Sequence, residues 1–160
     1  MEEQKNETGC CPRFNPEPWE DKILNWDNKR FIRDKVKCLF YMPLNFGQVM
    51  QRLDKKISVS GAQTPDYLYL AEHPSKWRMD IFLAVDKEVK NVENVFLSGK
   101  YYVKVYEGDF RETEKWCKDY AEKAQEKGIK TDKMYMWYTT CPKCAKVYGK
   151  NYVAIIAEII

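Results

Sequence analysis

Apolar and polar side chains alternate along residues 35–42, which predicts a strand with one buried face. The apolar positions on that face are Val36, Cys38, Phe40 and Met42. A helix is predicted next, because Asn45 is a good N-cap and Gln48 completes a capping box three residues later. Apolar residues then recur at helical spacing as far as Ile57. This part of the chain therefore predicts a strand followed by a helix.

The rest of the chain predicts further strands and a second helix. The second helix has Asp109 as a candidate N-cap with Glu112 three residues later, and Gly128 ends it. Consecutive strands are expected to pair antiparallel, with one helix per half packed on the sheet. The further predicted strands are 67–71, 79–85, 100–107, 134–140 and 152–159. The order strand, helix, strand, strand thus occurs twice, which favours an internal duplication with a groove between the two helices.

Residues 1–34 are predicted to form an N-terminal arm outside the main domain, which we place at 35–160. Prolines keep the first part of the arm extended. Trp19, Ile23 and Trp26 then recur at spacings of four and three, which predicts a short helix docked on the body of the protein. The two repeats of the main domain are placed at about 35–90 and 99–160.

The composition is that of a globular protein, with 160 residues of which 44% are hydrophobic and 32% charged. A net charge of +3 with both signs interspersed gives little support to nucleic-acid binding. No apolar stretch reaches the roughly 18 residues of a membrane-spanning helix, and the polar N-terminus has no signal-peptide pattern. We therefore expect a cytoplasmic protein that binds neither nucleic acid nor a membrane.

Aromatic residues make up 14% of the chain, with eleven Tyr and five Trp. This excess indicates that some rings line a ligand cavity, although packing in the core explains them equally well. His73, the one histidine, lies in a sequence typical of a solvated turn. A single imidazole excludes most Cys–His and Ser–His nucleophile schemes, which need that ring near the nucleophile.

Glu107 is the acidic residue that the pattern singles out. Its position in the alternating strand places it on the apolar face with Tyr101 and Val103, which we expect to point toward the helix side and the groove. A carboxylate there loses its solvation and its pKa rises. Glu107 is therefore a candidate general base for a water molecule, or a partner for a cationic ligand. The alternative is that solvent reaches Glu107 at the end of its strand.

The strand at 134–140 supplies candidate aromatic walls. Tyr135 and Trp137 share one face of this strand and Tyr138 lies on the other, and the alternation does not decide which face lines a groove. Aromatic rings hold a flat ligand by stacking, and a tyrosine hydroxyl donates to an oxygen on which charge develops. Packing is again the competing interpretation. Further candidate wall residues are Phe40, Phe46, Tyr101 and Trp116.

The cysteines leave three interpretations open. Cys141 and Cys144 have the spacing of a zinc knuckle, and Cys10 and Cys11 complete four metal ligands if the N-terminal arm folds back. A redox-active pair and a tight turn with buried free thiols are the alternatives. Two other cysteines, Cys38 and Cys117, lie on apolar faces and are expected in the core.

Several runs of the sequence carry a family resemblance. They are Tyr106-Glu107-Gly108-Asp109-Phe110, which leads into the second predicted helix, and residues 10–14, 43–47, 138–146 and 148–152. With them the chain resembles the GyrI-like small-molecule-binding domains, and in particular a stand-alone branch whose members are labelled hydrolases. The resemblance implies an α+β fold of the SHS2 type, a tandem pseudo-two-fold β-α-β-β repeat whose antiparallel sheet and two helices flank a central groove.

The resemblance also implies a function. Some GyrI-like proteins hydrolyse the reactive cyclopropane of DNA-alkylating natural products and so protect the cell. The first hypothesis is therefore a detoxifying hydrolase for an aromatic or polycyclic small molecule, in which Glu107 activates water and Tyr135 stabilises the developing charge without a required cofactor. The alternatives are a non-catalytic drug-binding protein and a zinc-stabilised interaction module. The oligomeric state is left open.

Overall fold

The computed structural model of the protein describes residues 14–139 and 149–160. The chain divides into two compact units, one formed by residues 26–98 and the other by residues up to 25 together with 99–160. We refer to them as the middle unit and the terminal unit. Within the described residues both units contain antiparallel strands and one α-helix each, so the protein is of mixed α and β class.

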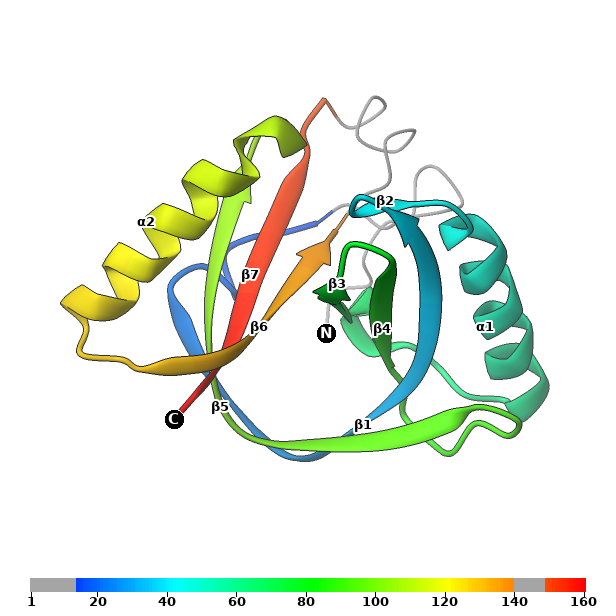
Figure 1. The fold of residues 1–160 in the computed structure, drawn as a ribbon. Helices are drawn as coiled ribbons and strands as arrows, with labels where there is room; N and C mark the ends of the chain where they lie inside the picture. The colour runs from blue at the N-terminus through cyan, green and yellow to red at the C-terminus, as the bar shows by residue number, and fades with distance from the viewer. Residues whose placement is uncertain (1–13, 140–148) are drawn as a thin grey trace. The chain divides into compact units, whose positions relative to one another are not determined.

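The middle unit is a four-stranded antiparallel sheet in the order β2-β1-β4-β3, with helix α1 on one face (Figure 1). The buried side chains of α1, Val49, Leu53 and Ile57, recur every four residues, as the sequence predicts. The helix reaches the sheet through Arg52, which pairs with Asp34 on β1 at 2.8 Å. The elements are β1 (Lys22–Leu39), β2 (Met42–Pro43), α1 (Phe46–Ser60), a 3-10 turn (Pro65–Tyr67), β3 (Tyr69–Ser75) and β4 (Arg78–Ala84).

The short helix predicted around Trp19 is wrong. A turn occupies this place, in which the amides of Trp19 and Glu20 both donate to the carbonyl of Pro16 at 2.9 Å, and β1 begins at Lys22. Strand β1 pairs with β4 and also with β5, so its backbone groups gain partners that a helix of eight residues does not provide. Because β1 runs continuously through position 34, the described part of the predicted arm does not form a separate part of the fold.

The end of β1 also differs from the expectation. The predicted strand extends to Met42, but β1 ends at Leu39 and the chain reverses through Phe40 and Tyr41. The reversal pairs Leu39 with Met42 across a two-residue turn, so the alternation stops and the expected burial of Phe40 and Met42 is wrong. Both turn residues have positive φ, a conformation that costs a non-glycine residue roughly 1–3 kcal/mol.

Side chains occupy the amides along the outer edge of β1. The amide of Lys37 donates to Oδ1 of Asn45 at 2.8 Å, and the amide of Lys35 donates to Oδ1 of Asp34 at 2.7 Å. The capping box predicted for Asn45 is therefore not formed, because its side chain binds the strand and makes no capping bond to α1. The backbone carbonyl of Asn45 still accepts from Val49, which begins the helix.

The terminal unit contains β6, β7 and β5 in that order, all antiparallel, with helix α2 on one face (Figure 1). The ring of Trp116 stacks on Tyr106 with centroids 5.8 Å apart, and the hydroxyl of Tyr120 donates to the carbonyl of Tyr102 at 2.8 Å. The even-numbered residues of β5 therefore face α2. The elements are β5 (Glu93–Glu107), a 3-10 turn (Phe110–Glu112), α2 (Thr113–Glu126), β6 (Thr131–Tyr138) and β7 (Tyr152–Ile159).

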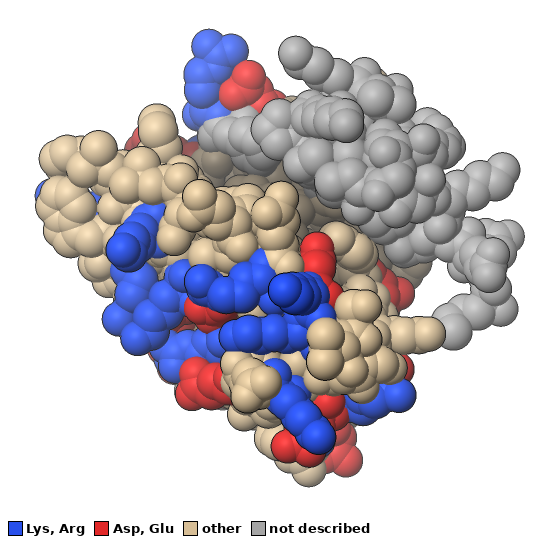
Figure 2. Space-filling view, turned by 90° about the vertical axis from the view of Figure 1, so that its right-hand side faces the viewer, with Lys and Arg blue, Asp and Glu red and all other residues tan. Residues whose placement is uncertain are grey.

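Charges of both signs are mixed on the surface around α1. Figure 2 shows Lys and Arg side chains across the face that α1 presents, with Asp and Glu side chains among them. This mixture agrees with the small net charge of +3. Among the described residues no helix is long and apolar enough to cross a membrane.

Candidate functional site

The predicted aromatic wall residues of the terminal unit lie on opposite faces of its sheet. The register of β5, β6 and β7 places Tyr101, Tyr135 and Trp137 on the face away from α2. Tyr138 lies on the other face, and Trp116 projects from α2 itself. These residues therefore do not form the wall of one surface, because a sheet separates them.

The rings on the face away from α2 are packed. Tyr101, Tyr135 and Trp137 are each at most 3% exposed. Phe14 and Trp19 contact Trp137 edge-on, with centroid distances of 5.2 and 4.9 Å. Residues before β1 thus cover Trp137 with aromatic rings of the same chain. The sequence analysis placed Trp19 on a short helix and did not consider Phe14, so it missed the contacts of both with Trp137.

Glu107 is exposed, so the predicted burial of its carboxylate is wrong. It is the last residue of β5 and belongs to the face away from α2, whereas the sequence analysis placed that face on the helix side. Its direct cross-strand neighbour is Tyr152 on β7. Tyr135, the tyrosine that the sequence analysis chose, aligns with a β7 residue four positions further on, about 13 Å along the strand at about 3.3 Å per residue.

Two runs that carried the family resemblance meet at this strand end. The amide of Gly108 donates to the carbonyl of Asn151 at 3.1 Å, and Nδ2 of Asn151 donates to the carbonyl of Gly108 at 2.8 Å. The hydroxyl of Thr139 donates to the carbonyl of Tyr152 at 2.8 Å. We call Glu107, Gly108, Thr139, Asn151 and Tyr152 the strand-end cluster. Reciprocal bonds fix its backbone, which holds Glu107 and Tyr152 side by side on one face of the sheet.

One atom of the strand-end cluster lacks a partner. Oδ1 of Asn151 is buried and accepts no hydrogen bond within the part of the chain that the structure describes. A buried acceptor without a donor is unfavourable by about 1–3 kcal/mol, so a donor supplied by a ligand or water stabilises it. The cluster therefore combines an exposed carboxylate, a neighbouring phenol and an unused amide oxygen.

The two wall candidates of the middle unit, Phe40 and Phe46, differ in their exposure to solvent. Phe40 is exposed in the β1–β2 turn, where its ring lies 5.2 Å from Trp77. Phe46 is half-buried at the start of α1, with its ring 6.2 Å from Tyr69. Their role as ligand walls stays a prediction.

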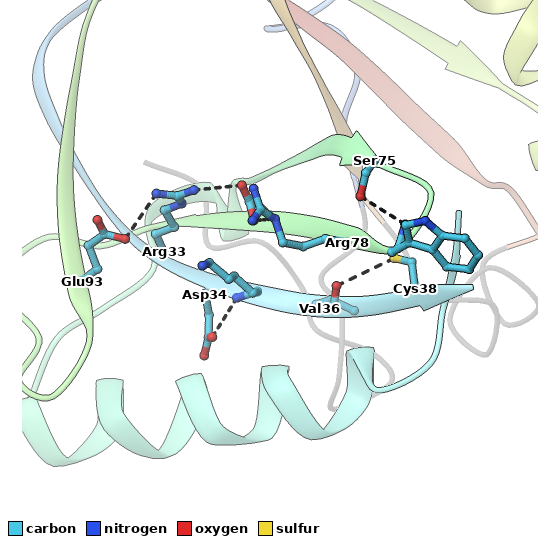
Figure 3. A network of polar contacts seen from close by, with 10 residues as sticks. Arg33, Asp34, Val36, Cys38, Ser75, Arg78 and Glu93 are labelled. Atoms are coloured by element: carbon cyan, nitrogen blue, oxygen red, sulfur yellow. Dashed lines mark hydrogen bonds and ion pairs between the residues drawn. The ribbon is translucent and has the colours of Figure 1, made fainter. Parts of the chain in front are cut away.

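The middle unit holds a charged cluster that the sequence analysis missed. Asp80 is 2% exposed in the centre of the sheet, and its carboxylate lies 2.9 Å from Arg33 and 3.2 Å from Arg78. Arg33 also contacts Glu93 of β5 at 3.5 Å, on the side away from Arg78 (Figure 3). Asp34 points to the opposite side of β1, toward α1. The signal was a single acidic residue within an apolar strand. Two guanidinium groups neutralise the buried carboxylate, so the cluster links strands β1, β4 and β5 through ion pairs.

Tyrosines on the α2 side bind carboxylates. Tyr102 donates to Asp21 at 2.6 Å and Tyr106 donates to Asp119 at 2.8 Å. Burial raises the pKa of both phenols far above the ordinary value, and the hydrogen bonds to the two carboxylates raise it further. These phenols hold their protons at neutral pH, and their hydrogen bonds tie β5 to the turn before β1 and to α2.

The remaining titratable candidates are of two kinds. The predicted metal ligands Cys10, Cys11, Cys141 and Cys144 lie outside the described residues. Cys38 is buried, as predicted, while Cys117 is half-buried, and burial raises the pKa of both thiols. His73 is half-buried within β3, not in a solvated turn, and burial lowers its pKa. The described residues contain no group of three or more His, Cys, Asp or Glu side chains arranged to hold a metal ion.

The model of a family described as bacterial hydrolase matches residues 1–159. The chain belongs to this bacterial hydrolase family. The strand-end cluster therefore lies within the matched region, and a hydrolase-type or small-molecule-binding function fits the family. No curated protein matches the chain.

Several solved structures of other proteins have a fold similar to that of this chain. An uncharacterized conserved protein from Listeria innocua aligns with a TM-score of 0.62 and 13% identity, covering 88% of this chain and 92% of its own. A hydrolase from Listeria innocua aligns with a TM-score of 0.62, 12% identity and the same coverage. A third structure, of a protein bound to tetraphenylphosphonium, aligns with a TM-score of 0.51 and 10% identity, covering 88% and 94%. At these identities the likeness concerns the fold alone.

Proposed function

We propose that the protein hydrolyses an aromatic or polycyclic small molecule at the strand-end cluster, with Glu107 and Tyr152 in contact with the substrate. The membership in the bacterial hydrolase family carries this proposal. The pairing of Glu107 with Tyr152 supports the location, because it brings a proton acceptor and a hydroxyl donor together on one face. The exposed position of Glu107 leaves its carboxylate accessible to a substrate.

The finer form of the proposal is a GyrI-like hydrolase that opens a cyclopropane conjugated to a carbonyl. Apart from the two-residue strand β2, the order strand, helix, strand, strand occurs in each unit, which supports the tandem repeat of that family. In the reaction, the oxygen of water bonds to a cyclopropane carbon while Glu107 accepts the water proton. The breaking carbon–carbon bond sends its electron pair to the conjugated carbonyl, whose oxygen receives a proton from the hydroxyl of Tyr152. The product has gained one water, and no cofactor is required.

Turnover of a cyclopropane-bearing alkylator by the purified full-length protein tests the proposal. We expect many equivalents of ring-opened product per protein, and a loss of 10²-fold or more in kcat for Glu107→Gln, the range for removal of a general base. Tyr152→Phe should also lower kcat. Tyr135→Phe is the matched control, because Tyr135 lies on the same face but not beside Glu107. Equal losses for Tyr152→Phe and Tyr135→Phe would contradict the location, and absence of turnover would contradict the reaction.

A second candidate function is binding without chemistry. The exposure of Glu107 favours it, because a carboxylate in contact with water lacks the desolvation that strengthens a general base. The fold neighbour that binds tetraphenylphosphonium, an aromatic cation, supports it as well. For a binder we expect protection of one equivalent of alkylator per protein, unchanged in Glu107→Gln. Mass spectrometry of the small molecule after incubation separates this result from turnover.

A further inference from the structure

The turn between β1 and β2 forms an exposed apolar surface together with the turn between β3 and β4. Its six large side chains are each between 49% and 68% exposed. Monomeric proteins rarely expose contiguous apolar patches of more than a few hundred Å², and larger patches mark interaction sites. We call this surface the hairpin patch. It consists of Leu39, Phe40, Tyr41, Met42, Leu44 and Trp77.

The hairpin patch has a fixed backbone. The amide of Tyr41 donates to the carbonyl of Lys76 at 2.9 Å, and the amide of Cys38 donates to the carbonyl of Trp77 at 2.8 Å. These bonds join the two turns and bring the rings of Phe40 and Trp77 to 5.2 Å. Figure 3 shows Cys38 and Ser75 close together at this end of the sheet. There the amide of Trp77 donates a hydrogen bond to the hydroxyl oxygen of Ser75 at 3.2 Å. The exposed rings are therefore held in place by both turns.

The backbone conformation of the turn is unusual for its residues. Phe40 and Tyr41 have φ of 48° and 69°, the left-handed region in which glycine and asparagine are at ease. Bulky residues rarely adopt this conformation, and such outliers gather at functional sites. The chain thus places two aromatic rings where folding alone favours small residues, and both rings face solvent.

Two lysines, Lys37 and Lys76, lie in the segments that form the hairpin patch, and segments 35–44 and 74–78 contain no acidic residue. Arg78 is paired with Asp80, whose cross-strand neighbour is Lys35, so the positive charge that a partner would meet at the patch is that of Lys37 and Lys76. The ammonium of Lys76 lies 5.7 Å from the ring centroid of Phe40. Two copies of the chain that met through this surface would bring like charges together, which disfavours self-association here. An acidic surface is the electrostatic complement.

We propose that the hairpin patch is a docking site for an acidic protein segment that carries apolar side chains. Aromatic residues and methionine are enriched at the centres of protein interfaces, and Lys and Arg at the rim select a partner of opposite charge. The proposal concerns a surface of the middle unit and does not depend on the reaction proposed for the strand-end cluster.

A pair of synthetic peptides tests the docking site on the full-length protein. One peptide alternates Leu or Phe with Glu or Asp, and the other has Lys at every acidic position. Calorimetry measures binding, and hydrogen exchange locates it. We expect the acidic peptide to bind at least tenfold more tightly than the basic one, to weaken with added salt, and to protect amides within 39–44. The double variant Lys37→Glu, Lys76→Glu should lose at least tenfold in affinity for the acidic peptide.

Further variants separate the patch from general effects. Phe40→Ser should abolish binding, whereas Val59→Ser should leave it unchanged, because Val59 is an exposed apolar residue on α1 outside the patch. Equal affinity for both peptides, no binding, or protection elsewhere would overturn the proposal. So would a concentration-dependent dimer that Phe40→Ser abolishes, which makes a second copy the occupant, or binding to anionic vesicles without binding to the peptide.

Discussion

The hydroxyl of Tyr102 donates a 2.6 Å hydrogen bond to the carboxylate of Asp21 and so ties the turn before β1 to the middle of β5. Lys127 lies 3.3 Å from the other carboxylate oxygen. The bond to Tyr102 holds the pKa of Asp21 below its ordinary value. The pair therefore links the stability of the terminal unit to pH at both ends of the scale.

The sign of each effect follows from the direction of the shift. A lowered pKa means that Asp21 stabilises the fold above its ordinary pKa of about 4, and that this contribution is lost as pH falls further. The raised pKa of Tyr102 means that its contribution is complete below about pH 10 and is lost above it. We expect the melting temperature of Asp21→Asn to fall less steeply below pH 4 than that of the wild type.

The control for this experiment is Asp27→Asn, since Asp27 is exposed and lies on β1, six residues after Asp21. It should reproduce the wild-type acid limb. At neutral pH the loss in Asp21→Asn should be below about 1 kcal/mol, because the side chain is 43% exposed and water screens the pair. Identical acid limbs for Asp21→Asn and the wild type would contradict the linkage.

Gly108 is required by its surroundings. Its φ of 143° lies in the range that side chains rarely adopt, and an added Cβ would lie 2.8 Å from Oε2 of Glu112 and 3.4 Å from Trp116. We expect Gly108→Ala to lower the free energy of unfolding by roughly 1–3 kcal/mol. Gly47→Ala is the matched control, because nothing lies within 4 Å of that position and alanine favours the helix. Urea unfolding measures both, and an equal effect of the two variants would show that Gly108 is not constrained.

Asp80 and Asp34 provide a comparison between a buried and a surface ion pair. The side chain of Asp80 is 3% exposed beside two arginines, while Asp34 pairs with a half-exposed Arg52. Asp80→Asn removes the buried carboxylate from between Arg33 and Arg78, whose side chains are 29% and 44% exposed, and should cost about 1–3 kcal/mol of unfolding free energy. Asp34→Asn should cost less than about 1 kcal/mol. Chemical denaturation measures the free energy of unfolding of both variants. A loss in Asp80→Asn no larger than that in Asp34→Asn would show that solvent replaces the missing charge.

Zinc at Cys10, Cys11, Cys141 and Cys144 remains a prediction that metal analysis tests. Phe14, three residues after Cys11 in the sequence, contacts Trp137, four residues before Cys141. Protein purified without chelator should contain about one zinc per chain, and Cys141→Ser should lose it. Cys117→Ser should retain it. Protein free of zinc would leave a redox pair or free thiols.

The sequence predicts most of the secondary structure because the relevant patterns are local. Helix α1 shows buried residues every four positions, and β7 is found at the predicted residues. Strand β1 was missed over its first half, since its partners β4 and β5 lie far along the chain and Trp19, Ile23 and Trp26 imitate a helical face. Pairing between distant segments overrides such short patterns.

The site could be predicted only in part for a similar reason. Both faces of β5 are buried over 101–103, so the alternation did not reveal which side α2 covers. The partner of Glu107 depends on the register between β5 and β7, which no local pattern encodes. Tyr135 and Tyr152 were equivalent in the sequence, and the strand pairing distinguishes them.

The side chains of Asn45 and Asp34 occupy amides along the border of β1 that a foreign strand would otherwise use. Because these amides already have acceptors, the edge of β1 is less able to pair with a strand of another, unfolded copy of the protein. Loss of the Asn45 side chain would leave the amide of Lys37 open to pairing with another strand, without any change in the interior of the protein.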